Sequence, residues 1–253
     1  MNNEISLVDI ILPNYNSAET LEETINSVVS QKFKNFKFYI IDDGSSDNSV
    51  DIIKKFKDDR IILVQLKKNK GVHFSRNLGI RFSNSKYISF IDSDDYWEKD
   101  KLNNQVNFMQ KYNHNFTYTD YIPFSYNNGK KKFKNKINVN DSFNFSRFIN
   151  DTSIAMSSVI IKREIINNIK FKKLKICEDY LFKCEILKKH KAYKCNGVLM
   201  YYRISRNSLQ SNKFRNLYWV WKINKKFNKL KLLRNLISVI SISLNSIKKY
   251  GFK

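Results

Sequence analysis

The chain of 253 residues has few of the residues that form rigid turns or disulfides: 2 prolines, 6 glycines and 3 cysteines. No run approaches the ~20 apolar residues of a membrane-spanning helix. Residues 1–16 are too polar, and their apolar stretch is too short, for a signal peptide. The odd number of cysteines excludes a fully paired disulfide framework, and their spacing does not fit a metal site. These absences favour a cytoplasmic protein.

Acidic residues are also scarce, with 23 Asp+Glu against 46 Lys+Arg, so the formal net charge is +23. Such an excess favours an anionic partner: nucleic acid, an anionic membrane or a phosphorylated substrate. The hydrophobic content of 42% and aromatic content of 14% exclude a disordered chain. The length is sufficient for one large α/β domain with a tail.

Several of the acids gather in one run, Ile88-Ser89-Phe90-Ile91-Asp92-Ser93-Asp94-Asp95. Its apolar half predicts a buried strand, so the three carboxylates follow at the carboxyl end of that strand. Crowded carboxylates raise one another's pKa, and a divalent cation with its preference for oxygen ligands relieves the repulsion. The alternative is a solvated turn with helix-capping aspartates.

The first half of the chain alternates strand and helix patterns. Strands are predicted over 8–12, 36–41, 61–64 and 87–91, with helices between them. This order predicts a mostly parallel sheet flanked by helices, with all carboxyl ends of these strands on one edge. Polar residues follow three of the strand ends, where open α/β sheets bind ligands: Pro13-Asn14-Tyr15, Asp42-Asp43-Gly44 and Asp92-Ser93-Asp94.

The second half has a less regular pattern. A helix is predicted to about residue 112, a strand over 116–121, and a mobile loop over the Asn/Lys-rich residues 127–150. A strand at 157–161, a short helix from Arg163 and a helix over 178–190 follow. Two short strands are predicted over 192–195 and 198–203.

Five motifs occur in a fixed order: LPNYNSAETLEETINSVVSQ, IIDDGSSDNS, NKGVHFSRNLGI, YISFIDSDDYW and CEDYLF. Together they resemble the family 2 glycosyltransferases of the GT-A fold, of the bacterial surface-polysaccharide type. The resemblance covers roughly residues 6–210. It implies a catalytic domain over 1–210, with a nucleotide-binding half at 1–95 and an acceptor half at 96–210. Residues 211–253 remain as a basic tail.

The resemblance also implies a reaction. An inverting enzyme would move a hexosyl or N-acetylhexosaminyl group from a nucleoside diphosphate sugar, here expected to be a UDP-sugar. The acceptor would be a hydroxyl of a growing surface glycan such as lipooligosaccharide, capsule or O-antigen. A divalent cation, Mn²⁺ or Mg²⁺, would neutralise the diphosphate leaving group.

Several residue roles follow from the resemblance alone. Asp94 would bind the metal, and Asp92 the ribose, the metal or its water shell. Asp95 ranks lower, as an outer-shell or helix-start residue. The other expected nucleotide-sugar contacts are Pro13, Asn14 and Tyr15 around the base, Asp42 or Asp43 on the uracil N–H, and Ser93 in the acidic run.

The remaining expected roles concern the diphosphate and the acceptor. Arg76 would reach the diphosphate, or else form a structural ion pair with a strand-end aspartate. Arg203 and Arg206 would balance diphosphate charge. Asp179, after Glu178 at a helix start, would be the general base; favourable interaction with the helix dipole alone is the alternative. Asp120 is a weaker candidate base.

The tail, residues 211–253, holds eleven Lys or Arg and no acid. Apolar residues at steps of three and four predict an amphipathic helix: Leu230, Leu233, Ile237, Ile240, Leu244 and Ile247. A basic, aromatic amphipathic segment suits an anionic membrane surface, which would make the protein peripheral on the inner face of the cytoplasmic membrane. Packing on its own domain or on a second subunit is the alternative.

Other functions are weaker interpretations of the sequence. A nucleic-acid-binding or membrane-binding protein without activity would explain the charge, but not three polar strand ends on one edge. A sugar nucleotidyltransferase would need a glycine-rich loop after the first strand, and Pro13-Asn14-Tyr15-Asn16 is not one. We therefore expect an enzyme that binds no nucleic acid.

Overall fold

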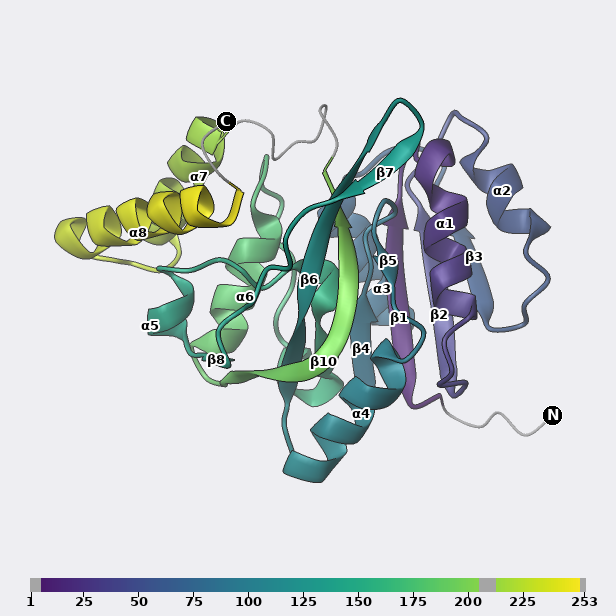
Figure 1. The fold of residues 1–253 in the computed structure, drawn as a ribbon, viewed down its shortest axis with the longest axis horizontal. Helices are drawn as coiled ribbons and strands as arrows, with labels where there is room; N and C mark the ends of the chain where they lie inside the picture. Colours follow the sequence, from purple (N-terminus) through teal and green to yellow (C-terminus); the bar gives the residue numbers. More distant parts are fainter. Residues whose placement is uncertain (1–5, 205–212, 251–253) are drawn as a thin grey trace.

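A computed structural model describes residues 6–204 and 213–250 (Figure 1). The strands are β1 (Val8–Asn14), β2 (Phe36–Asp42), β3 (Ile61–Gln65), β4 (Tyr87–Phe90), β5 (Tyr96–Trp97), β6 (Phe116–Asn127), β7 (Lys130–Phe133), β8 (Ser142–Phe143), β9 (Ile160–Lys162) and β10 (Ala192–Arg203). The helices are α1 (Ala18–Val29), α2 (Ser49–Lys55), α3 (Val72–Phe82), α4 (Lys101–Tyr112), α5 (Phe145–Phe148), α6 (Glu178–Leu187), α7 (Lys213–Lys226) and α8 (Leu232–Tyr250). Short 3₁₀ helices lie at η1 (Met156–Ser158) and η2 (Arg163–Ile166).

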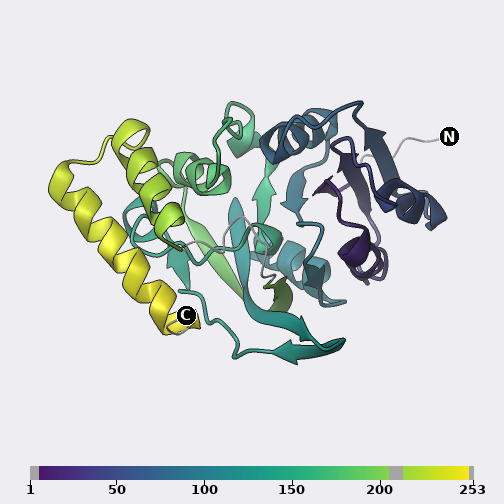
Figure 2. The ribbon, with the colours of Figure 1, turned by 90° about the horizontal axis from the view of Figure 1, so that it is seen from above.

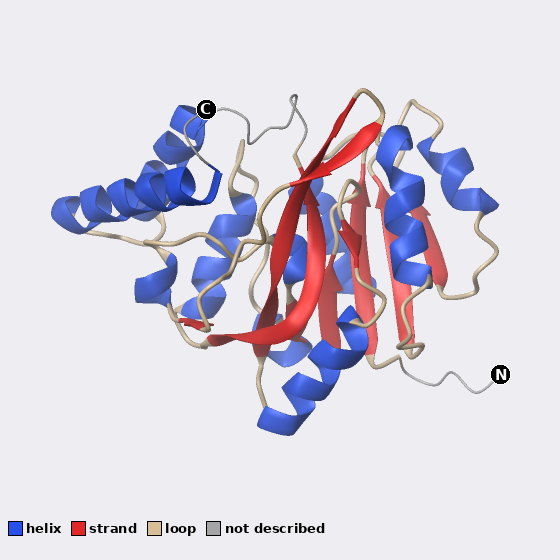
Figure 3. Cartoon of the chain, in the orientation of Figure 1, coloured by secondary structure: helices blue, strands red, loops and turns tan. Residues whose placement is uncertain are grey.

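One 10-stranded sheet crosses the molecule in the order β3-β2-β1-β4-β9-β6-β10-β5, with β7 on β6 and β8 on β10. Helices pack on both sides of it (Figure 3). The predicted parallel arrangement is confirmed for β3, β2, β1 and β4. The sheet becomes mixed at β9, which is antiparallel to both β4 and β6. Strands before and after residue 95 share this sheet, so the expected nucleotide-binding and acceptor halves are joined by one sheet.

Close packing of α3 against β1 fixes the edge at which the site forms. A Cβ added at Gly79 would lie only 2.5 Å from Cγ2 of Ile11, so a glycine is needed for this approach. On the other side, α1 begins after Ser17 and buries Leu21, Ile25 and Val28 against the sheet. The two helices therefore hold β1 between them and leave its carboxyl end at the sheet edge.

The prediction of a mobile loop over 127–150 was wrong, because this stretch contains β7, β8 and α5. Its lysines hide two anchors, Phe143 and Phe148, whose side chains are fully buried. Their burial offsets the entropy of ordering the polar residues around them. The two short strands expected near the end form one strand, β10, whose register with β6 shifts between Lys194 and Leu199. The strand expected at 157–161 begins only at Ile160, since Ser157 and Ser158 lie in η1.

The tail of the chain folds into two helices, α7 and α8, that contact each other at one end of the molecule (Figures 1 and 2). The predicted amphipathic helix is confirmed as α8. In the described part of the chain, no helix is both long and apolar enough to cross a lipid bilayer.

Candidate active site

The ends of β1 and β2 are paired, with Asn14 opposite Asp42 in the register. Asn14 Nδ2 donates to Asp42 Oδ1 at 2.7 Å and to Ser45 Oγ at 3.1 Å. Ser45 Oγ in turn donates to Asp42 Oδ1 at 2.5 Å. Asp42 is buried, and its carboxylate organises the turn after β2. Of the two aspartates expected near a uracil, Asp42 thus has an internal structural role.

Asp43 connects the strand edge to the loop that leads into α3. Its carboxylate accepts the backbone N–H of Lys70 at 2.8 Å and that of Gly71 at 2.7 Å. Its own backbone N–H donates to the carbonyl of Asn14 at 2.8 Å. The Asp43 side chain is therefore also engaged within the protein. Of the residues predicted to frame the base, Pro13 is buried, whereas Tyr15 is 48% exposed.

Residues 92–95, the acidic loop, follow β4 and are held on both sides. The backbone N–H of Asp92 donates to Ser157 Oγ at 3.0 Å. Ser93 is held by α1: its carbonyl accepts hydrogen bonds from the hydroxyls of Thr20 at 2.8 Å and Thr24 at 3.0 Å, and its hydroxyl lies 2.7 Å from Ser17 Oγ. The N-terminal turns of α1 thus fix the loop backbone, which leaves the Asp92 and Asp94 side chains to face other groups.

The acidic loop carries more negative charge than its surroundings compensate. Burial, together with the charge of Asp92, raises the pKa of Asp94 to about 6, although Arg203 opposes the shift. Burial also raises the pKa of Asp95, with further contributions from Asp94 and Asp92. Asp95 is fully committed inside the protein, since it accepts from Ser157 Oγ at 2.5 Å and from the Arg203 backbone N–H at 2.9 Å. This structural role of Asp95 is consistent with the expectation that it is a weaker candidate for binding a metal than Asp94.

Asp92 and Asp94 are suited to a hard divalent cation. Among the described residues, no group of three or more His, Cys, Asp or Glu side chains could enclose a metal on its own. Two carboxylates fit the way Mg²⁺ is bound at phosphate sites, where one or two protein carboxylates and the substrate's phosphates share it. The raised pKa of Asp94 is the electrostatic cost that such an ion would remove.

Arg76, on α3, links the acidic loop to the start of α6. It is 4% exposed, and its guanidinium donates to Asp92 Oδ1 at 2.7 Å and to Glu178 Oε1 at 2.8 Å. Burial lowers its pKa, but the carboxylates of Asp92, Glu178 and Asp179 more than offset this and raise it. Of the two roles predicted for Arg76, the structure contains the ion pair. This bridge brings residues 92 and 178 into one site.

Asp179 lies in the first turn of α6 in an environment that favours its charge. Burial raises its pKa, yet Lys183 and Arg76 outweigh burial and the net shift is downward. Lys183 Nζ lies 2.8 Å from Asp179 Oδ2 and also donates to the Ile154 carbonyl at 2.8 Å. Burial raises the pKa of the neighbouring Glu178 instead. Asp179 is thus ionised and oriented, as a proton acceptor must be.

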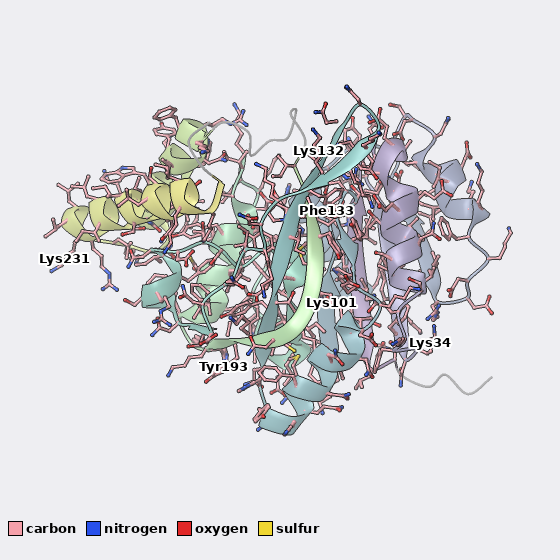
Figure 4. All side chains as sticks on the ribbon, in the orientation of Figure 1. Lys34, Lys101, Lys132, Phe133, Tyr193 and Lys231 are labelled. Atoms are coloured by element: carbon pink, nitrogen blue, oxygen red, sulfur yellow. The ribbon has the colours of Figure 1, made fainter. Side chains whose placement is uncertain are left out.

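Arg203 closes the other side of the acidic loop. Its Nε donates to the Asp94 carbonyl at 2.8 Å, and its Nη2 lies 2.5 Å from Glu23 Oε2. Glu23 also pairs with Lys131 at the tip of the β6–β7 hairpin, which rises beside α1 (Figure 1). Lys132 and Phe133 mark the position of this hairpin in Figure 4. The diphosphate role expected for Arg203 stays a prediction, and Arg206 lies outside the described residues.

Asp120, the weaker base candidate, has a structural environment. Its carboxylate accepts a hydrogen bond from the Val139 backbone N–H at 2.8 Å and lies 3.4 Å from Lys136 Nζ.

Two residues that hold the site in place, Glu23 and Lys183, were not predicted from the sequence. The spacing of four between Asp179 and Lys183 could have suggested their ion pair on a helix. Glu23 gave no such indication, since its partners lie 108 and 180 residues away.

Comparisons with known proteins identify the family of this chain. The family model described as glycosyl transferase family 2 matches residues 9–170. This chain belongs to glycosyltransferase family 2. As a family 2 member, it resembles the UDP-Glc:alpha-D-GlcNAc-diphosphoundecaprenol beta-1,3-glucosyltransferase WfaP of Escherichia coli. The two are 34% identical, and the match covers 98% of this chain and 97% of WfaP.

This glycosyltransferase is also similar in fold to solved structures. S. aureus TarS 1–349 in complex with UDP-GlcNAc has a TM-score of 0.70 at 19% identity, covering 95% of this chain and 72% of TarS 1–349. The mannosyltransferase PcManGT from Pyrobaculum calidifontis, in complex with GDP-Man and Mn²⁺, has a TM-score of 0.69 at 13% identity, covering 98% of this chain and 72% of that one. The expected GT-A fold and the glycosyltransferase class are confirmed.

Proposed function

We propose that this glycosyltransferase transfers a sugar, with inversion, from a UDP-sugar to a hydroxyl of a lipid-linked or growing surface glycan. The observation that carries the proposal is the Arg76 bridge. It joins Asp92 on the donor edge to Glu178, the neighbour of Asp179. A carboxylate suited to a metal–diphosphate and a carboxylate suited to take a proton thereby belong to one site.

The acidic loop would hold the donor's diphosphate through a divalent cation. Asp94 and Asp92 would be the protein ligands of Mn²⁺ or Mg²⁺, and when bound the ion would neutralise charge on the departing diphosphate. The raised pKa of Asp94 supports this role. The Mn²⁺ in the complex of the similar PcManGT is consistent with it.

Asp179 would act as the general base. As the acceptor oxygen forms its bond to the anomeric carbon, the bond from that carbon to the diphosphate oxygen breaks, and the hydroxyl proton passes to the Asp179 carboxylate. Lys183 orients that carboxylate and favours its ionised form. One such displacement inverts the anomeric centre.

The remaining donor contacts would lie at the strand ends. The exposed ring of Tyr15 would stack on the base, with Pro13 and Asn14 shaping the floor beneath it. Asp42 and Asp43 would act chiefly by holding the loops around the base, because both carboxylates already bind protein groups. Ser93 would position the acidic loop, and Arg203 and Arg206 would complement the diphosphate charge.

The donor and acceptor classes rest on the chain's relatives. WfaP is named for UDP-Glc as donor and for an undecaprenol-linked acceptor, and it matches nearly the whole chain. We therefore place this enzyme at the inner face of the cytoplasmic membrane, as a peripheral protein that meets lipid-linked glycans.

A nucleotide-sugar panel tests the proposal. The purified chain is incubated with UDP-, GDP- and CMP-sugars and a short-chain GlcNAc-diphospholipid, and nucleotide release is measured with Mn²⁺, with Mg²⁺ and with a chelator. We expect release of UDP that depends on both cation and acceptor, and calorimetric binding of UDP. Release of GDP or CMP alone would contradict the donor assignment, and full activity with chelator would contradict the metal. The double variant Asp94→Asn/Asp179→Asn controls for a contaminating transferase.

A further inference from the structure

Helix α8 turns a row of apolar residues away from the protein. Five of its apolar residues form an outer stripe that is largely exposed, whereas Val239 and Ile242 pack against the core. The stripe consists of Leu233, Leu236, Ile237, Ile240 and Leu244. At about 100° per residue these positions fall within one arc of the helix. Leu233 is 71% and Leu244 62% exposed. A surface helix normally turns such a stripe toward the core.

The inner face of α8, which meets the rest of the protein, combines polar contacts with a core residue. Asn235, Ser238 and Ile242 are buried there, and Ile242 belongs to the hydrophobic core. Asn235 Nδ2 donates to the Trp221 carbonyl at 3.1 Å, and Ser238 Oγ donates to the Ile149 carbonyl. Further along the helix, Asn245 Nδ2 donates to the Asn150 carbonyl at 3.0 Å, and Lys249 pairs with Asp151 at 2.6 Å.

These contacts show that the tail packs on its own domain, which was one of the alternatives for it, and that it does so through the inner face of α8. The outer stripe does not pack on the chain's own domain, because specific polar contacts occupy the side of α8 that does. Both views of the fold place α8 at the outer edge of the molecule (Figures 1 and 2). A row of exposed apolar side chains of this length indicates a surface that something else covers.

The charge around the outer stripe favours one occupant. Residues 211–253 hold eleven Lys or Arg and no acid. Lys231 immediately precedes α8, as Figure 4 shows. Arg234 and Lys248 are exposed on the helix, and Arg234 also donates to Ser146 Oγ at 2.8 Å. A twofold contact between two copies would bring the same cations face to face. An anionic lipid surface offers both hydrocarbon for the stripe and negative headgroups for the cations.

We propose that α8 is a membrane-docking helix. It lies along an anionic phospholipid surface with its outer stripe inserted at the headgroup boundary, and its inner face keeps the catalytic domain attached. The proposal rests on the position of α8 and not on glycosyl transfer. If the proposed function also holds, docking brings the site to lipid-linked acceptors.

Vesicle binding tests the proposal on the full chain. We expect sedimentation with vesicles containing about 30% phosphatidylglycerol, and at least about tenfold weaker binding to pure phosphatidylcholine. The triple variant Leu233→Gln/Ile237→Gln/Ile240→Gln should lose binding by at least about tenfold, since it removes most of the inserted apolar area. Its thermal unfolding and its UDP release with a water-soluble acceptor should match those of the parent chain. Phe82→Gln, at an exposed apolar residue on α3, is the matched control.

Two results would overturn the proposal. One is binding by the triple variant equal to that of the parent chain. The other is a parent dimer in light scattering that the triple variant dissociates, without vesicle binding by either protein; the stripe would then be a subunit interface. A chain that binds vesicles but releases no UDP would contradict the proposed function and leave the docking helix intact.

Discussion

Two aspartates of the site, Asp94 and Asp179, have surroundings that shift their pKa in opposite directions. In the acidic loop, burial and mutual repulsion raise the pKa of Asp94 to about 6. At the start of α6, Lys183 and Arg76 outweigh burial and lower the pKa of Asp179. Both side chains are aspartates whose pKa burial raises, so the difference in direction comes from the neighbouring charges.

The difference indicates how work is divided within the site. Asp179 receives its compensating cations, Lys183 and Arg76, from the protein itself, and they favour its ionised form. The acidic loop receives too few, because Arg76 is shared between Asp92 and Glu178 and the Arg203 guanidinium pairs with Glu23. A site of this kind gains most from a cation that arrives with the substrate. Each prediction below tests one side of that contrast.

Removing the charge of Asp94 is expected to have the largest effect. Asp94→Asn keeps the side-chain shape but removes the charge that the cation would balance. Because metal assistance is worth several kcal/mol, we expect metal-dependent UDP release to fall by about 10³- to 10⁴-fold. Steady-state kinetics across a Mn²⁺ titration measure the loss. The control Asp51→Asn, at an aspartate in the first turn of α2, should leave the rate unchanged. If Asp94→Asn kept the metal dependence of the parent chain, the proposed contrast between the acidic loop and Asp179 would be contradicted.

Neutralising Asp179 should separate binding from chemistry. Asp179→Asn is expected to lower kcat by about 10²- to 10⁴-fold, the usual range for a general base. The affinity for UDP in calorimetry should stay within a few-fold of the parent value, because the donor edge lies on other elements. Asp120→Asn is the matched variant at the weaker base candidate. If it stops transfer while Asp179→Asn does not, the base lies on β6.

The order of the strands and the position of the strand-end residues could be predicted from the sequence, because they depend on local patterns. Apolar runs such as 8–12 and 36–41 indicated buried strands, and the crossover rule placed Asn14, Asp42 and Asp92 on one edge. The register of β1 and β2 confirms that Asn14 and Asp42 are direct neighbours. These predictions depended only on hydrophobic periodicity over a few residues, and a single sequence contains that information.

Pairings between distant residues could not be predicted. The ion pair of Arg203 with Glu23 spans 180 residues, and that of Arg76 with Glu178 spans 102. Either arginine could have faced a diphosphate equally well by sequence. The stretch 127–150 misled for a related reason: its order depends on Phe143 and Phe148 reaching the core, which composition does not reveal. The amphipathic pattern of α8 was clear, but not which face meets the protein.

Breaking the Arg76 bridge between the acidic loop and α6 should cost stability. Arg76→Met leaves Asp92 and Glu178 without their buried partner, a change worth about 3 kcal/mol or more. We expect Tm to fall by roughly 6–12 °C in calorimetry, together with a loss of transfer. Lys32→Met removes the exposed pair with Asp100 and should change Tm far less. Similar small effects of both substitutions would mean that the bridge does not join the acidic loop and α6 energetically.

Removing Lys183 should make Asp179 more like the acidic loop. Lys183→Met takes away the cation that lowers the pKa of Asp179, so that pKa rises and the acidic limb of the kcat–pH profile moves to higher pH. The loss of rate should therefore be greater at about pH 5.5 than at about pH 8. Lys188→Met, which affects the pair with Glu185 further along α6, is the control. An acidic limb at the parental pH would mean that Asp179 is not the titrating base.

The smallest expected effect concerns pH: the amount by which a bound cation raises the Tm should depend on pH. The folded pKa of Asp94 lies above its ordinary value of 3.8, at about 6. Its ionisation therefore opposes folding, so the stability tied to this group is present at low pH and is lost as pH rises through about 6. A bound cation offsets that loss. The Tm increase caused by Mn²⁺ should be larger at about pH 7.5 than at about pH 5, by roughly 2–4 °C. Asp94→Asn should abolish this difference, and a Tm increase independent of pH in the parent chain would place the cation elsewhere.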